Sequence, residues 1–377
     1  EMKRVYLDII LERYHASNKK AKGLILDEFC YTAGYSRKYA IRLLNDPKHI
    51  IGKKRGPKPK YDATVVFHLK ALWEAMGKIC SKKMKAAIPL WLPFYKVDER
   101  NKNLLLEISP STIDRLLSPY RGTRKGISST QPGFLNSIPI KLLRSEIAEP
   151  GYMEVDTVAH CGDSLAGSFI SSLTMTDLFS GWTENRASMS KRAEDIVEQI
   201  KDIELGLPFI LKGYASDNGT EVLNKTVQKY LTDRSRPVDI VRGRPYKKND
   251  QAHVEQKNYT HVRQLFRYNR YEEKDLCYLM NEIYRAFWNP LQNYFIPVLK
   301  LKSKERIGSK VKKKYDDPKT PFQRLIESED ISSSEKARLK EIIKTKNPFY
   351  LKKELDRRLK NFFRIAEMAK KQDMEAS

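Results

Sequence analysis

Cysteine is scarce in this chain, which has only Cys30, Cys80, Cys161 and Cys277 among 377 residues. The four lie far apart and form no CxxC motif, so nothing in the sequence indicates a disulfide framework. The six histidines make no zinc spacing with them, and His160 beside Cys161 lacks a second pair of ligands. We therefore expect no structural zinc, and four free thiols fit a reducing, cytoplasmic compartment.

Long apolar segments and a signal peptide are also missing. The termini carry neither a lipidation signal nor a basic amphipathic helix with a strong apolar face, so we expect no membrane partner. The hydrophobic content is 40%, which is typical of a chain that folds. Its length is enough for two or three domains and at least one sizeable core.

Positive charge is the clearest excess. The chain holds 71 Lys and Arg against 47 Asp and Glu, a formal charge of +24. Like charge on this scale opposes compaction, and phosphate is its usual compensating ligand. The composition therefore predicts a nucleic-acid partner rather than a small-molecule substrate.

Residues 1–50 have the pattern of a helix-turn-helix module. An apolar stripe with Ile25, Phe29 and Cys30 is interrupted at Gly34, and Ser36 then precedes a second stripe with Ala40, Ile41 and Leu44. Basic side chains at the start of the second helix are placed where base and phosphate contacts occur in such motifs. These candidate DNA-binding residues are Arg37, Lys38 and Arg42. An ordinary helical hairpin with a solvated face has the same pattern.

Residues 51–61 form a basic linker, because two glycines and two prolines in GKKRGPKPKYD preclude a helix. Lys53, Lys54 and Arg55 either lie in a DNA minor groove or are part of a solvated tether. Residues 62–120 suggest a second helix-turn-helix-like module, with a hairpin region around positions 98–103 and Arg115 facing outward. A Gly/Ser-rich basic stretch marks residues 121–145 as another linker.

Residues 146–275 predict an α/β domain. Three strand-like segments come first, followed by a helix, a strand, a helix, a short strand and a long helix at 249–270. This order predicts a mixed five-stranded sheet with helices on its faces.

Three carboxylates stand at informative places in this domain. Asp156 is in the middle of the first strand, Asp217 ends a buried strand, and Glu255 borders the apolar stripe of the long helix. A strand-centre Asp is costly unless it is paired or binds a metal, and clustered acids repel one another. A divalent cation removes that repulsion, and two such ions support phosphodiester chemistry.

Each carboxylate also has an ordinary structural interpretation. Asp217 begins an Asp-Asn-Gly turn signal and can simply cap it. Glu255 can pair with Lys257 or Arg263 on the surface, and Asp156 can hydrogen-bond a neighbouring strand. The joint order of the three acids is what favours a shared metal site.

The segments MEVDTV, YASDNGTEV and RPYKKNDQAHVEQKN resemble the three acidic motifs of transposases from bacterial insertion sequences, within the retroviral-integrase superfamily. The resemblance covers about residues 145–320. It implies a ribonuclease-H-like catalytic core, Mg²⁺ or Mn²⁺ as cofactor, and Asp156, Asp217 and Glu255 as catalytic metal ligands.

Two features depart from the family pattern. Many relatives have a basic residue seven positions after the glutamate, where this chain has Val262. The basic contact to DNA then comes from Lys257, Arg263 or Arg267. The N-terminal zinc module of the retroviral proteins is also absent. Ahead of the glutamate, we expect the DNA backbone to be held by Arg244, Lys247 and Lys248.

Residues 276–377 predict a basic, mainly helical C-terminal region. Positions 296–320 hold nine Lys and Arg against three acids, which is typical either of a solvated tail or of a segment that follows DNA. A last helix starts at Asn347–Pro348 and has an apolar face for the core or for an oligomer contact.

Together these features predict a DNA transposase that binds the terminal inverted repeats of a mobile element and joins them to target DNA. The resemblance implies a homo-oligomer, because two element ends must be brought together, and a bacterial cytoplasmic, nucleoid-associated protein. Two alternatives stay open: a catalytically silent DNA-binding regulator derived from a transposase, and a nuclease of this fold without joining activity.

Overall fold

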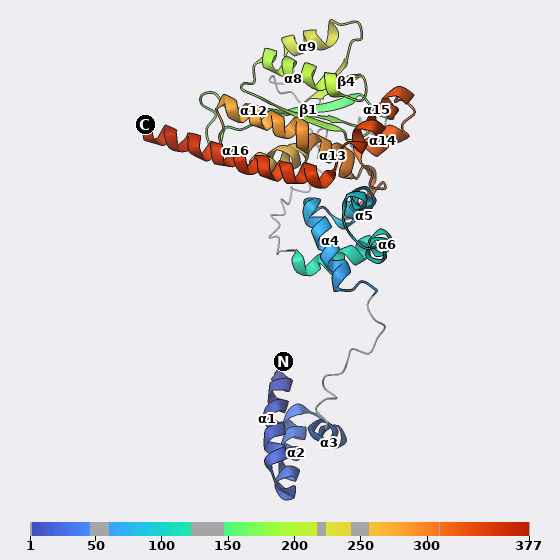
Figure 1. Ribbon diagram of the computed structural model, residues 1–377, viewed down its shortest axis with the longest axis vertical. Helices are drawn as coiled ribbons and strands as arrows, with labels where there is room; N and C mark the ends of the chain where they lie inside the picture. Colours follow the sequence, from blue (N-terminus) through green and yellow to red (C-terminus); the bar gives the residue numbers. More distant parts are fainter. Residues whose placement is uncertain are drawn as a thin grey trace. The chain divides into compact units, whose positions relative to one another are not determined.

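The computed structural model describes residues 2–45, 60–121, 147–216, 224–242, 256–308 and 310–376 (Figure 1). The chain divides into two compact units, Glu1–Lys60 and Tyr61–Ser377. The finer boundaries expected from the sequence stay predictions. None of the helices in the described ranges is both long enough and apolar enough to cross a membrane.

The first unit is a three-helix module. Its helices are α1 (Met2–Ala16), α2 (Lys19–Ala33) and α3 (Arg37–Asn45). The turn between α2 and α3 works as predicted: Gly34 adopts φ +68°, which glycine tolerates without strain, and donates its N–H to the carbonyl of Cys30. Phe29 and Leu44 are buried in the core of the module. Ile41 was predicted to face inward but is exposed, and Leu43 takes the buried position.

The second unit starts with four helices. They are α4 (Ala63–Ala75), α5 (Ser81–Trp91), α6 (Glu99–Glu107) and α7 (Pro110–Leu117), with short 3₁₀ turns η2 (Leu92–Phe94) and η3 (Ser118–Tyr120). The hairpin expected around residues 98–103 is wrong. Asp98 instead caps α6 by accepting a hydrogen bond from the backbone N–H of Asn101 at 3.0 Å.

A five-stranded mixed sheet forms the centre of the second unit. Its strands are β1 (Tyr152–Ala159), β2 (Ser171–Asp177), β3 (Thr183–Ser188), β4 (Gly213–Ser216) and β5 (Asp239–Arg242). The strand order is β3-β2-β1-β4-β5. The β1–β2 and β2–β3 pairs are antiparallel, whereas β1–β4 and β4–β5 are parallel. The predicted mixed α/β core of the ribonuclease-H-like class is therefore confirmed.

Helices cover both faces of this sheet (Figure 1). One side carries α8 (Ala193–Gly206) and α9 (Lys225–Thr232). The other side carries the π-helix η7 (Asn258–Arg263), α11 (Gln264–Phe266), α12 (Lys274–Glu282), the π-helix η8 (Ile283–Trp288) and α13 (Asn289–Phe295). The helix predicted to reach residue 270 ends earlier, because Arg267 has φ +63°. Val262 and Leu265 are buried, as their stripe predicted.

The C-terminal region contains a hairpin as well as helices. The basic stretch forms β6 (Leu301–Ile307) and β7 (Lys310–Tyr315), and then come α14 (Pro321–Glu327), α15 (Ser333–Lys344) and α16 (Pro348–Ala376). The long helix α16 runs along α12 and α13 (Figure 1). Its fully buried Phe362 packs edge-on against Phe266 with ring centroids 5.0 Å apart. The last helix thus belongs to the core of the unit.

The four-helix segment is fixed to the core through Trp91. This side chain is fully buried at the end of α5, and its indole N–H donates to the carbonyl of Phe295 at 3.1 Å. Its ring also meets Phe349 of α16 edge-on at 5.0 Å. One side chain therefore joins the helices before the sheet to two helices after it.

Replacing Trp91 by Ala is expected to lower the free energy of unfolding by about 3–5 kcal/mol, because it opens a large cavity and leaves the Phe295 carbonyl without its donor. Thermal and urea melts followed by circular dichroism measure this. Phe67→Ala is the control, since Phe67 on α4 is mostly exposed, and a change within about 0.5 kcal/mol is expected for it. Equal effects of the two changes would contradict the role given to Trp91.

Candidate active site

Asp156 lies at the centre of β1, between β2 and β4. Its Oδ2 accepts a hydrogen bond of 2.6 Å from the side-chain amide of Asn258. Its Oδ1 accepts one of 2.8 Å from the backbone N–H of Thr157. The carboxylate is partly buried, and in the described part of the chain an amide and a backbone N–H donate to it.

Asn258 comes from the helical segment that directly follows Glu255. The described helix begins at Gln256 and continues as the π-helix η7. Asn258 is buried, and its Oδ1 has no hydrogen-bond partner within the described residues. The site therefore places an unsatisfied acceptor next to Asp156, and π-turns of this kind are frequent at functional sites.

The other two predicted carboxylates, Asp217 and Glu255, lie outside the described residues. Their flanks are described. Ser216, the last residue of β4, pairs with Val155 of β1 in parallel register. In the sequence, Asp217 directly follows Ser216, and Asp156 directly follows Val155. Among the described residues, no three His, Cys, Asp or Glu side chains come close enough together to hold a metal ion.

A row of buried polar side chains starts beside Asp156 and crosses the sheet. Thr174 of β2 pairs with Asp156, and Asn185 of β3 pairs with Thr174. Asn185 Nδ2 donates to Thr174 Oγ1 at 2.9 Å, and its Oδ1 lies 3.2 Å from Nδ1 of His261 on η7. His261 Nε2 in turn lies 3.3 Å from the Lys257 ammonium.

His261 is neutral in this row. Burial lowers its pKa well below the ordinary value, and the nearby charges of Lys257 and Lys83 lower it further. The neutral ring then donates from Nδ1 to Asn185 and accepts from Lys257 at Nε2, which satisfies both nitrogens. Each side chain in the row, from Lys257 through His261 and Asn185, therefore donates a hydrogen bond to the next, and Thr174 accepts the last one.

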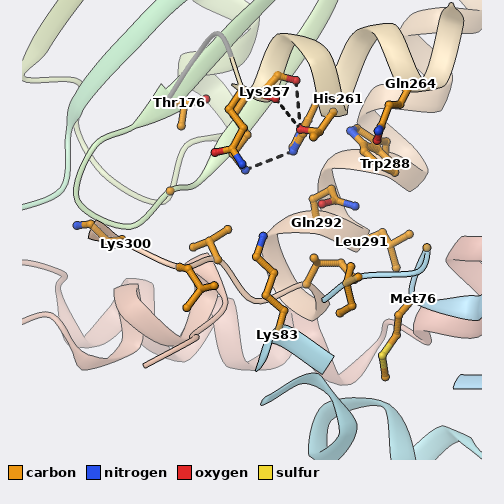
Figure 2. A pocket seen from close by; sticks show the side chains of 18 of the residues that line it. Met76, Lys83, Thr176, Lys257, His261, Gln264, Trp288, Leu291, Gln292 and Lys300 are labelled. Atoms are coloured by element: carbon orange, nitrogen blue, oxygen red, sulfur yellow. Dashed lines mark hydrogen bonds between the residues drawn. The ribbon is translucent and has the colours of Figure 1, made fainter. Parts of the chain in front are cut away.

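Lys257 faces a cavity of about 440 Å³ (Figure 2). Burial lowers the pKa of Lys257 to about 7, and the charge of Lys83 contributes to the shift. Burial also lowers the pKa of Lys83, on α5. Lys257 was predicted to contact DNA, and this stays a prediction. Its side chain is half-buried and lines this cavity.

The other predicted DNA-binding residues fall into two groups. Arg37, Lys38 and Arg42 are exposed on α3, although Arg37 forms an ion pair with Asp27. Arg115 is exposed on α7, and Arg263 is half-buried with its guanidinium 4.7 Å from the ring of Tyr268. Six more lie outside the described residues, namely Lys53, Lys54, Arg55, Arg244, Lys247 and Lys248.

Sequence reasoning missed three side chains that the structure brings to this region. Asn258 stands three positions after Glu255, a spacing that puts two residues on one helix face, so it was open to prediction. His261 and Lys83 gave no such signal. Lys83 meets the helix of Lys257 only through the packing of α5 on the core, which no local pattern encodes.

Comparison with known proteins gives one sequence relative and several distant structural likenesses. No family model matches the chain. "Uncharacterized protein y4rM" of Sinorhizobium fredii (strain NBRC 101917 / NGR234) is 35% identical over 329 residues, which cover 84% of this chain and 93% of the relative. The catalytic core domain of BIV integrase aligns with 46% of this chain and 91% of its own, at 14% identity and a TM-score of 0.30. The simian T-cell lymphotropic virus intasome in complex with PP2A regulatory subunit B56 gamma aligns with 48% of this chain and 60% of its own, at 15% identity and a TM-score of 0.29.

Changing Asn258 to Asp is expected to lower the melting temperature more than changing it to Ala. Alanine removes the donor to Asp156, which costs about 1–3 kcal/mol, and aspartate adds like-charge repulsion. Thermal melts of the variants at neutral pH and low salt measure the order. Gln256→Asp is the matched control, because Gln256 is exposed one half-turn earlier on the same helix. If Asn258→Asp has the same melting temperature as the wild type, the contact with Asp156 does not contribute to stability.

Proposed function

The chain belongs to the same family as protein y4rM of Sinorhizobium fredii, and we propose that it is a DNA transposase of the retroviral-integrase superfamily. It binds the ends of a mobile element and catalyses metal-dependent strand cleavage followed by strand transfer. The contact between Asp156 and Asn258 carries this proposal. It ties the end of the third acidic motif to the strand that contains the first.

The strand register supports the same convergence from the other side. Val155 and Ser216 are paired neighbours, and each is followed in sequence by an aspartate. Asn258 contacts Asp156 and follows Glu255 by three positions. All three acidic motifs therefore have a flanking residue in or beside one small region at the middle of the sheet.

The chemistry of the three acids fits a divalent cation. Asp156, Asp217 and Glu255 are hard oxygen donors, which Mg²⁺ and Mn²⁺ prefer. The Oδ1 of Asn258, beside Asp156, is a further buried oxygen without a partner in the described part of the chain. When bound, the metal supplies activation of the attacking oxygen and stabilisation of the leaving oxygen. The chain's own residues position the ligand: the Asn258 amide and the Thr157 N–H hold the two carboxylate oxygens of Asp156 in place.

DNA recognition is assigned to the helical modules. The three basic residues on α3 are exposed on the helix that follows a glycine turn, and Arg115 is exposed on α7. The charge of +24 supplies the sequence-independent part of binding. We place the protein with the nucleoid in the bacterial cytoplasm, working as a homo-oligomer on terminal inverted repeats and target DNA.

Asp156→Asn, Asp217→Asn and Glu255→Gln are each expected to reduce cleavage and joining at least about 100-fold while DNA affinity stays within about threefold, because only the metal-binding charge is removed. Gel assays with element-end duplexes and a supercoiled plasmid, with and without Mg²⁺, measure nicking and joining. The control is Asp275→Asn, exposed on α12.

The same assay separates the alternatives. Nicked but never joined products would identify a nuclease, and DNA binding without any metal-dependent nicking would identify a silent regulator. Full activity of Asp156→Asn would contradict the proposed active site directly.

Lys38→Ala and Arg42→Ala are expected to weaken binding of the full chain to element-end DNA by several-fold each and to lower the slope of log affinity against log salt by about 0.9 per lost phosphate contact. Fluorescence anisotropy across a salt series measures both. Lys340→Ala serves as the charge-matched control on α15. If all three variants behave alike, α3 has no special role in binding.

A further inference from the structure

The cavity beside Lys257 has a strongly basic lining. It lies between α5, the helix of residues 256–266, α13 and the start of α16 (Figure 2). Four lysines line it, namely Lys83, Lys257, Lys300 and Lys352. Asp177 is the one carboxylate among the described lining residues. The cavity therefore holds more positive than negative charge in a partly desolvated space.

Two of the four lysines have partners among the described residues. Lys352 forms an ion pair with Asp356 on α16. Lys300 donates to the carbonyl of Phe179, and its pKa is lowered by burial and then by the charge of Arg324, while Asp177 and Asp316 oppose the shift. The Asp177 carboxylate is itself occupied by the backbone N–H groups of Gly151 at 2.9 Å and Ser180 at 2.7 Å. It is therefore not free to pair with the remaining lysines.

Lys83 and Lys257 are left with charges that the described residues do not balance. Within the described chain, Lys83 makes no ion pair or hydrogen bond, and Lys257 contacts only the neutral ring of His261. Figure 2 shows both ammonium groups reaching into the same space, one from α5 and one from the opposite helix. Two half-buried ammonium groups in one cavity repel each other and lose hydration, which is costly without an anion.

A neutral donor stands in the same cavity. The indole Nε1 of Trp288, at the end of η8, is buried and has no acceptor within the described residues. The ring is held edge-on against His261, with centroids 5.3 Å apart. Two ammonium groups thus reach into one cavity of about 440 Å³, and its wall contains a tryptophan whose buried N–H has no acceptor within the described residues. Phosphate oxygens are the acceptors that such a donor set suits.

We propose that this cavity binds a phosphate group of a DNA strand, with Lys83 and Lys257 as its charged ligands and Trp288 as a neutral donor. That the phosphate belongs to DNA rests on the proposed function. Lys257 neighbours Asn258, which holds Asp156, so the bound phosphate lies next to the candidate active site. Lys83 belongs to α5, so the same phosphate links the four-helix segment to the core.

Protection of lysines from acetylation tests this in the wild-type chain. Element-end duplex is expected to reduce modification of Lys83 and Lys257 at least about fivefold, measured by peptide mass spectrometry, while exposed Lys340 is modified equally with and without DNA. Parallel arms contain inorganic phosphate, a deoxymononucleotide or an acidic peptide alone. Protection by these small anions but not by DNA would overturn the assignment to DNA, and no protection by any of them would overturn the anion site. Protection only by an acidic peptide would overturn it in favour of a protein ligand.

Variants give an independent measure. Lys83→Met and Lys257→Met are each expected to lower the salt slope of DNA binding by about 0.9, and Trp288→Phe to weaken affinity without changing the slope. Both methionine variants should melt at or above the wild-type temperature without DNA, because an unbalanced charge is removed. A merely structural lysine would lower the melting temperature and leave the slope unchanged. Lys340→Met is the control.

The outcome can be separated from that of the proposed function. Suppose that the wild type cleaves and joins DNA, that neither lysine substitution changes the salt slope, and that DNA does not alter acetylation of Lys83 and Lys257. The phosphate site is then wrong, whereas the proposed transposase activity is supported. If DNA protects both lysines and yet no metal-dependent cleavage occurs, the site stands on a DNA-binding protein without that activity.

Discussion

The hydrogen bond from Asn258 to Asp156 is the contact on which the proposed site depends. It joins the last residue of the third acidic motif to the central strand of the sheet. Without it, the strand register alone would connect only the first two motifs. Because the amide of Asn258 is neutral, this hydrogen bond holds the carboxylate without cancelling its negative charge.

The surroundings of this contact separate two kinds of charge. On one side is the carboxylate of Asp156, and on the other are the ammonium groups of Lys257 and Lys83. A row of neutral side chains lies between them, from Thr174 through Asn185 to His261. Because His261 is kept neutral by burial and by the neighbouring cations, it separates the acid from the lysines without adding a charge of its own. In the proposed function, the metal-binding Asp156 and the phosphate-binding Lys257 are then kept from pairing with each other.

The sequence was sufficient for the parts of the fold that local patterns encode. The strands around Asp156 and the turn at Gly34 follow from alternation of apolar residues and from the tolerance of glycine for positive φ. The basic hairpin of β6 and β7 was missed because its many lysines hide the strand pattern. Helix α6 was missed because positions 98–103 were interpreted as a hairpin, whereas Asp98 caps a helix. The candidate site divides in the same way. The position of Asp156 on its strand was predictable, whereas the approach of Lys83 to Lys257 depends on packing between segments that are distant in the chain.

The hydrogen bond from Trp91 to Phe295 fixes the four-helix segment to the core. This restricts where a bound duplex can contact both parts. Trp91 gives the four-helix segment one fixed offset from the sheet, since its indole is locked between α13 and α16. In the proposed function, a duplex that touches both α7 and the acidic centre must meet them at one helical phase. Each added base pair turns the duplex by roughly 34°, given about 10.5 base pairs per turn. A rigid join between two protein segments would thereby set a distance in nucleotides between the sequence that is recognised and the bond that is cut.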